Sequence, residues 1–133
     1  MTTKTFGRAM VAVAMAGTAM LSVGISAGAA SASEAAASIG DNQPNNTHGV
    51  WCVQHLINDV ARQNNRATVD EDGVWGPQTK DQVLWFQNFV HLPTDGIVGP
   101  FTGDNVLYHG DQYYGGKSGY CFTYVPSDSG LFE

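Results

Sequence analysis

The amino-acid sequence predicts an all-α protein: a small three-helix bundle with two tight Asp-Gly turn loops and an irregular, disulfide-tethered C-terminal tail. Apolar residues recur at helical spacing in three segments after residue 49. The phrase DGVWGPQT, at residues 72–79, returns 23 residues later as DGIVGPFT, at residues 95–102. The two cysteines of the chain, Cys52 and Cys121, enclose both phrases.

The first 32 residues have the pattern of a secretory signal peptide. Lys4 and Arg8 precede an apolar run rich in Ala and Gly, and Ala30-Ser31-Ala32 follows it. A membrane anchor is the alternative, but the apolar run is too short to span a bilayer comfortably. We expect cleavage after Ala32 and a product that is secreted, extracellular or cell-wall associated, with no membrane contact after cleavage.

The charge of the chain is acidic. Two of the six basic residues precede residue 33, so four basic residues stand against 12 acidic ones, a formal charge of −8. Proteins that bind nucleic acid or anionic lipid by charge carry a basic surface. We therefore expect no nucleic acid among the partners.

Residues 33–48 are rich in Ala, Ser, Asn and Pro, with little to bury, and they predict a flexible linker. A folded domain is then expected at residues 49–108. Its first helix is predicted at about residues 50–63, where Val50, Val53, Ile57 and Val60 form one apolar face.

Each repeated phrase predicts a turn that feeds a helix. Asp72-Gly73 favours a turn because Gly accepts a positive φ, and Val74 and Trp75 are then expected to point inward. Pro77 suits the first turn of a helix.

The start of the second helix has a second interpretation. Thr79 and Gln82 also spell a capping box, so the boundary stays open between Pro77 and Thr79. The helix carries Val83 and Phe86 on one face.

The second helix should end near His91, because Pro93 disfavours helical backbone at the residue before it. The second phrase then repeats the device. Ile97 and Val98 are expected to point inward, and a third helix is expected to begin at Gly99-Pro100.

Two cysteines in an exported domain of this size favour a disulfide, with two free thiols as the alternative. The Cys52–Cys121 bond would close a loop of roughly 70 residues and contribute about 4 kcal/mol in the chain-entropy model. Residues 109–133 are then predicted to form a Tyr-rich extension that this bond ties to the first helix.

The two phrases, with Val53-Gln54 and Phe86-Gln87 before them, resemble the peptidoglycan-binding domain family of the three-helix type. That family accompanies bacterial cell-wall amidases, carboxypeptidases and spore-cortex hydrolases. The resemblance covers about residues 50–108, and the tail has no counterpart in the family's module. It implies a non-catalytic domain that binds cell-wall peptidoglycan.

The sequence offers no convincing catalytic group. Residues 49–110 contain no serine, and no tail serine stands in a nucleophile motif. Asp70, Glu71, Asp72 and Asp95 are the candidates for a glycosidase pair, but turn geometry and solvation account for them. The four histidines show no short-spaced pair and the Asp70-x-Asp72 run lacks a later acidic ligand, so no metal or cofactor is expected.

A polymer of sugars and peptides calls for aromatic and short polar side chains. The expected ligand is peptidoglycan, through its glycan or its stem peptide. A protein partner, a cell-wall hydrolase that the chain inhibits or regulates, is the alternative, and a small wall hydrolase is a third hypothesis. The residues predicted to bind the ligand are Asp72, Gln87, Asn88, Asp95, Tyr108, Tyr113 and Tyr114.

Overall fold

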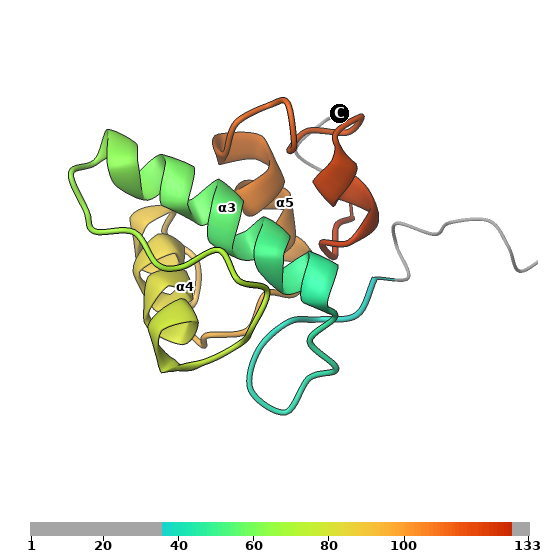
Figure 1. Ribbon diagram of the computed structural model, residues 1–133, viewed down its shortest axis with the longest axis horizontal. Coiled ribbons are helices and arrows are strands. Elements are labelled where there is room, and N and C mark those ends of the chain that lie inside the picture. The colour runs from blue at the N-terminus through green and yellow to red at the C-terminus, as the bar shows by residue number, and fades with distance from the viewer. Residues whose placement is uncertain (1–35, 129–133) are drawn as a thin grey trace, which may run out of the picture. The chain divides into compact units, whose positions relative to one another are not determined.

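The computed structural model describes residues 36–128, so the predicted signal peptide lies outside the described residues. Within residues 36–128, three α-helices follow one another, α3 (Thr47–Gln63), α4 (Pro77–Phe89) and α5 (Pro100–His109), and a short 3₁₀ helix, η5 (Tyr120–Thr123), follows them. α3 packs against each of the other three elements (Figure 1). The described part contains one isolated β-bridge and no strand, which confirms the all-α, three-helix prediction.

α3 begins at Thr47, three residues before the predicted start, because Asn46 caps it. The Asn46 side-chain oxygen accepts hydrogen bonds from the backbone N–H groups of His48 (2.9 Å) and Gly49 (3.2 Å). The helix buries a continuous stripe of aliphatic side chains, as its periodicity predicts. Val50, Val53, Leu56, Ile57, Val60 and Ala61 are all at most 4% exposed.

α3 and α4 end in the same way, with a left-handed residue and two crossed backbone bonds. Asn65 (φ 57°) lies two positions after the last residue of α3, and His91 (φ 63°) lies two positions after the last residue of α4. After α4, the His91 N–H donates to the Asn88 carbonyl (3.1 Å) and the Leu92 N–H donates to the Gln87 carbonyl (2.8 Å). This is a Schellman motif, with an Asn or a His where Gly is most common.

The two later helices begin at the Gly-Pro of each phrase. Gly76 and Gly99 are their N-caps, without a side-chain cap bond, and Pro77 and Pro100 are the first helical residues. Thr79 lies inside α4, so the boundary that the sequence left open falls at Pro77. Because Pro has no N–H, its use here removes one of the donors that a helix start leaves unsatisfied.

In each phrase, only one of the two side chains that were predicted to point inward is packed against the core. Val98 is fully buried and Trp75 packs against the core, but Val74 is 63% exposed and Ile97 is half-buried. The backbone between turn and helix is extended, so adjacent side chains point to opposite sides. The prediction that Val74 points into the core is therefore wrong.

The segment predicted as a flexible linker is packed where the structure describes it. Ile39 is 1% exposed, and its N–H and C=O exchange hydrogen bonds of 3.1 and 2.7 Å with the C=O and N–H of Val98. Asp41 accepts hydrogen bonds from Trp75 Nε1 (2.9 Å) and Lys80 Nζ (2.6 Å). Residues 39–46 thus belong to the folded unit, because one apolar side chain and one backbone bridge anchor a polar segment.

The C-terminal tail is held against the helices at two places. Cys52 of α3 and Cys121 of η5 form the predicted disulfide, and both residues are fully buried. Further along, the Ser127 hydroxyl donates to the buried carboxylate of Asp104. A Cβ on Gly103 would lie 1.7 Å from the Pro126 carbonyl oxygen, so only glycine lets the tail cross α5 this closely.

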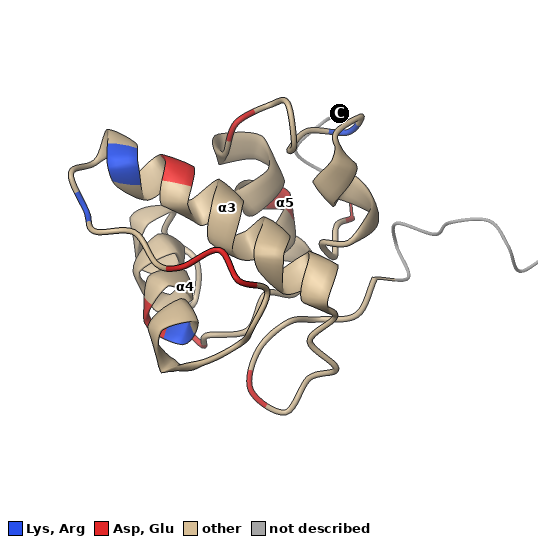
Figure 2. Cartoon of the chain, viewed as in Figure 1, with Lys and Arg blue, Asp and Glu red and all other residues tan. Residues whose placement is uncertain are grey.

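Basic side chains are few over the described residues, and Figure 2 shows no large gathering of them, whereas three acidic residues stand in a row at 70–72. Lys80 pairs with Asp41, and Arg66 pairs with Asp81 at 2.8 Å. Among the described residues, no helix combines the length and the apolar character that crossing a membrane requires.

Candidate functional site

The first phrase is held in place by a buried glutamine of α3. Gln54 is 1% exposed, and its Oε1 accepts the Gly73 N–H at 2.8 Å. Its Nε2 lies 3.1 Å from Asp72 Oδ1, 3.1 Å from the Val74 carbonyl oxygen and 2.9 Å from Thr79 Oγ1. The Gln54 side chain therefore contacts four residues of the phrase.

The second phrase is held by Gln87 of α4 in the same way. Gln87 is fully buried, and its Oε1 accepts the Gly96 N–H at 2.9 Å. Its Nε2 lies 2.9 Å from Asp95 Oδ1, 3.0 Å from the Ile97 carbonyl oxygen and 3.1 Å from Thr102 Oγ1. We name these two arrangements the Gln54 clamp and the Gln87 clamp.

The aspartates of the two phrases support their turns. Asp72 and Asp95 each accept the N–H of the residue two positions on, at 3.0 and 2.9 Å. The N–H of Val74 and the amide of Gln54 lower the pKa of Asp72. Gly73 and Gly96 take φ values of 73° and 75°, where a Cβ is strained.

A hollow lies beside each phrase. The hollow at the second phrase has a volume of about 180 Å³ and is lined in part by Asp95, Ile97 and Phe101. The hollow at the first phrase has a volume of about 330 Å³ and includes Asp72 and Val74. Phe101 is 71% exposed and Val74 is 63% exposed. Each hollow therefore has a large apolar side chain that the fold does not bury.

The predicted binding residues do not form one group. Asp72 and Asp95 belong to separate hollows, and Gln87 is buried in its clamp. Asn88 is exposed and Tyr108 is 53% exposed, but neither lines the hollows described in this section. A ligand role for these five residues stays a prediction.

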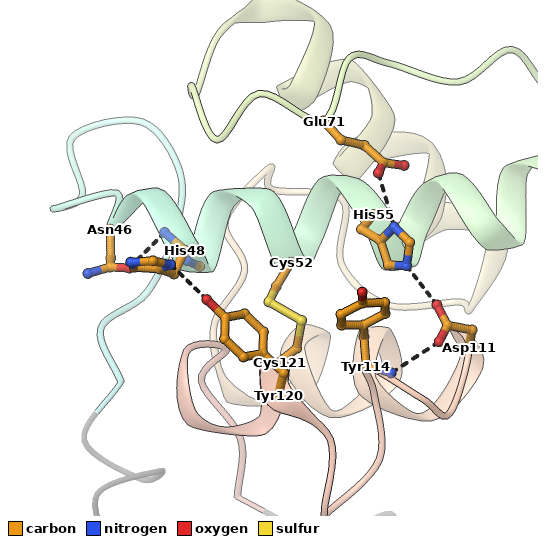
Figure 3. The surroundings of a disulfide bond; sticks show 10 residues. Asn46, His48, Cys52, His55, Glu71, Asp111, Tyr114, Tyr120 and Cys121 are labelled. Carbon is orange, nitrogen blue, oxygen red and sulfur yellow. Dashed lines mark hydrogen bonds and ion pairs between the residues drawn. A yellow bond between two sulfur atoms is a disulfide. The ribbon is translucent and has the colours of Figure 1, made fainter.

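Tyr113 and Tyr114 lie together with two residues that the sequence did not single out as ligands. Trp51, Tyr113, Tyr114 and Tyr120 line a hollow of about 390 Å³, and we name these four residues the aromatic face. Tyr113 is 81% exposed and Tyr120 is 45% exposed. Figure 3 shows Tyr114 and Tyr120 on the tail, facing α3 on either side of the Cys52–Cys121 bond.

Three rings of the aromatic face are nearly perpendicular to one another. The Trp51 ring makes an angle of 74° with Tyr114 and 82° with Tyr120, and the two tyrosine rings make an angle of 88°. Their centroids are 5.3 to 6.4 Å apart, the range of favourable edge-to-face contacts. The rings therefore fix one another's orientation while leaving surface exposed.

A charged cluster supports Trp51. The His55 ring stacks on Trp51 with centroids 4.8 Å apart, and its two nitrogens lie 3.0 Å from Glu71 Oε1 and 2.8 Å from Asp111 Oδ2. Partial burial would raise the pKa of Glu71, but hydrogen bonds from Asn58 and His55 outweigh it and lower the pKa. Asp111 thus ties the tail to α3 beside the disulfide (Figure 3).

The sequence contained a signal for this surface. His48, Trp51 and His55 stand at i, i+3 and i+7, which places them on one side of α3 next to Cys52. Once Cys52 is paired with Cys121, the aromatic residues around Cys121 must meet that side. No group of three or more His, Cys, Asp and Glu within residues 36–128 is arranged to hold a metal ion.

Comparison with known proteins concerns the helical part. Residues 54–104 match the family model described as a putative peptidoglycan binding domain. No curated protein and no solved structure matches the chain. The matched span contains both clamps and both phrases, whereas all four residues of the aromatic face lie outside it. Within the chain, residues 54–104 are therefore similar to putative peptidoglycan-binding domains.

Proposed function

We propose that the protein is a secreted, non-catalytic module that binds the peptidoglycan of the bacterial cell wall. The observation that carries the proposal is the family match over residues 54–104, which supports binding to the cell wall. The charged leader, apolar run and small residues of positions 1–32 support secretion.

The surroundings of the acidic residues support a binding role over catalysis. A glycosidase needs one carboxyl group that stays protonated near neutral pH, which requires a raised pKa. The contacts of Glu71 and Asp72 instead lower the pKa of both carboxyl groups. Ser127, a tail serine, is buried and donates to Asp104, so its hydroxyl is not presented to a substrate.

Co-sedimentation with purified, insoluble peptidoglycan tests the proposal. The disulfide-bonded protein should pellet with the polymer, and the supernatant should contain no released muropeptides by mass spectrometry. Failure to pellet would overturn the binding proposal, and released muropeptides would overturn the non-catalytic one.

A protein partner is distinguished in the same experiment. If the protein binds a cell-wall hydrolase and not the wall, it stays in the supernatant of pure peptidoglycan and pellets only when the hydrolase is added. Deleting the tail is no substitute for this test, because Cys121 and Val125 are part of the core.

A further inference from the structure

We infer that the aromatic face binds the sugar rings of a glycan strand, in a site separate from the matched family domain. The inference deepens the proposed function by naming the part of the polymer that is bound. It starts from Tyr113, which is 81% exposed. Among the described residues, the Tyr113 ring makes one ring contact, an edge-to-face contact with Tyr114 in which the centroids are 4.9 Å apart. Packing of the core therefore does not account for this ring.

Three of the four polar groups of the aromatic face have no hydrogen-bond partner among the described residues, whereas the Tyr120 hydroxyl lies 2.7 Å from His48 Nδ1. Within residues 36–128, no hydrogen bond occupies the indole N–H of Trp51 or the hydroxyl groups of Tyr113 and Tyr114. The indole of Trp75 differs, since its N–H donates to Asp41 at 2.9 Å. The face thus offers ring surfaces together with one N–H and two hydroxyl groups.

This combination matches the chemistry of a pyranose ring. A sugar ring has an apolar face of C–H groups that packs on an aromatic ring, and hydroxyl and N-acetyl groups around its edge that exchange hydrogen bonds. The hollow of about 390 Å³ has room for a sugar residue, and no charged side chain lines it. An uncharged ligand therefore loses no ion hydration on binding.

A cationic ligand, such as the amine of a stem peptide, fits less well. Perpendicular aromatic rings do bind ammonium groups, and a neighbouring carboxylate usually strengthens such a site. The carboxylates beside this face, Glu71 and Asp111, both contact the His55 ring and so are already paired. The observations favour the glycan.

The tail builds this site outside the residues that match the family model. The disulfide and the Asp111–His55 contact bring Tyr113, Tyr114 and Tyr120 to Trp51 of α3. Because these four residues lie outside residues 54–104, the match to the family says nothing about them.

The test is a titration of the disulfide-bonded protein with a β-1,4-linked tetramer of N-acetylglucosamine, followed by NMR of the indole N–H groups. The Trp51 signal should shift and the Trp75 signal should not. Tyr113→Ala should weaken binding about tenfold, and Tyr113→Phe should keep most of it, because the ring supplies the packing. Phe89→Ala is the control, because Phe89 is a 39% exposed ring at the end of α4 that lines neither phrase hollow nor the aromatic face, and this variant should bind as the wild type does.

Several outcomes would overturn the inference. They are no shift with the tetramer, equal losses in Tyr113→Ala and Phe89→Ala, or a Trp51 shift with a sugar-free stem peptide or choline but not with the tetramer. Sedimentation with whole peptidoglycan is measured in parallel. If the wild-type protein pellets but does not bind the tetramer, the proposed function stands and the inference is overturned. If it binds the tetramer but does not pellet, the inference stands and the proposed function is overturned.

Discussion

The two clamps and the aromatic face use their polar groups in opposite ways. In each clamp, a buried glutamine contacts a turn N–H, a carboxylate, a carbonyl and a hydroxyl of the same chain. In the aromatic face, ring surface is left exposed, since Tyr113 is 81% exposed and Tyr120 is 45% exposed. The polar residues of the repeated phrases thus maintain the fold, whereas the tail and Trp51 of α3 together present an exposed aromatic surface.

Removing the disulfide should have the largest effect on stability and should also weaken the aromatic face. The double variant Cys52→Ala with Cys121→Ala should lose about 4 kcal/mol of unfolding free energy, because the loop of 69 positions is no longer closed. Urea unfolding measures the loss. Binding of the glycan tetramer should fall further than the lower stability explains, because Tyr120 neighbours Cys121. A loss below about 1 kcal/mol would show that the tail is held by its other contacts.

Ile39→Ala tests how far the second phrase depends on the residues before α3. Ile39 is 1% exposed and bridges Val98, so the substitution should cost about 2 to 4 kcal/mol through the cavity it leaves. Thermal unfolding checks it, with Val74→Ala as the control at an exposed position. Equal melting temperatures for the two variants would mean that the segment contributes nothing to the fold.

Breaking a clamp should have the next effect. Gln87→Leu leaves the Gly96 N–H and the Thr102 hydroxyl without their buried partner, at a cost of about 2 to 3 kcal/mol. Gln54→Leu should cost a similar amount for the first phrase. Gln63→Leu is the control, because Gln63 is exposed on the last turn of α3 and should change stability by less than about 0.5 kcal/mol. Indistinguishable denaturation midpoints for Gln87→Leu and Gln63→Leu would contradict the clamp.

Acid should weaken the contacts that Glu71 and Asp72 make at the start of the first phrase. The pKa values of Glu71 and Asp72 are lowered in the folded protein, so their contribution to stability is complete above their ordinary values, near pH 4, and is lost as pH falls through the folded values. The melting temperature should therefore decrease below about pH 4. The decrease should be smaller in Glu71→Gln, which cannot titrate at that position, and an equal decrease in both proteins would contradict this account.

Tyr113→Ala should have the smallest effect on stability. An exposed ring with one ring contact should change the unfolding free energy by less than about 0.5 kcal/mol. The same variant is expected to lose glycan binding, so its stability and its binding should separate. A loss above about 1 kcal/mol would show that Tyr113 belongs to the packing and would end the contrast with the clamps.

Much of the fold could be predicted from the sequence. The apolar period of α3, the Gly-Pro starts of α4 and α5 and the pairing of two cysteines are all local or compositional signals, and the structure contains each of them. The exposure of Val74 was missed because an extended backbone turns adjacent side chains to opposite sides.

The candidate site was harder to predict. Gln54 contacts an aspartate 18 positions later, and Gln87 contacts one 8 positions later. Because the two spacings differ, no common sequence spacing predicts the clamps. Ile39 is a single apolar residue in a polar segment, so no periodicity marks it as buried. Trp51 and Tyr120 meet only through the disulfide and the packing of the tail.

The position of the disulfide also has a mechanical meaning. A pull between the residues before Cys52 and those beyond Cys121 is carried along the chain to Cys52, across the sulfur bridge and onward from Cys121. Residues 53–120, which contain α4, α5 and both phrases, are then bypassed and cannot be stretched while the bond is intact. A module anchored to a wall under tension would keep these turns folded under load.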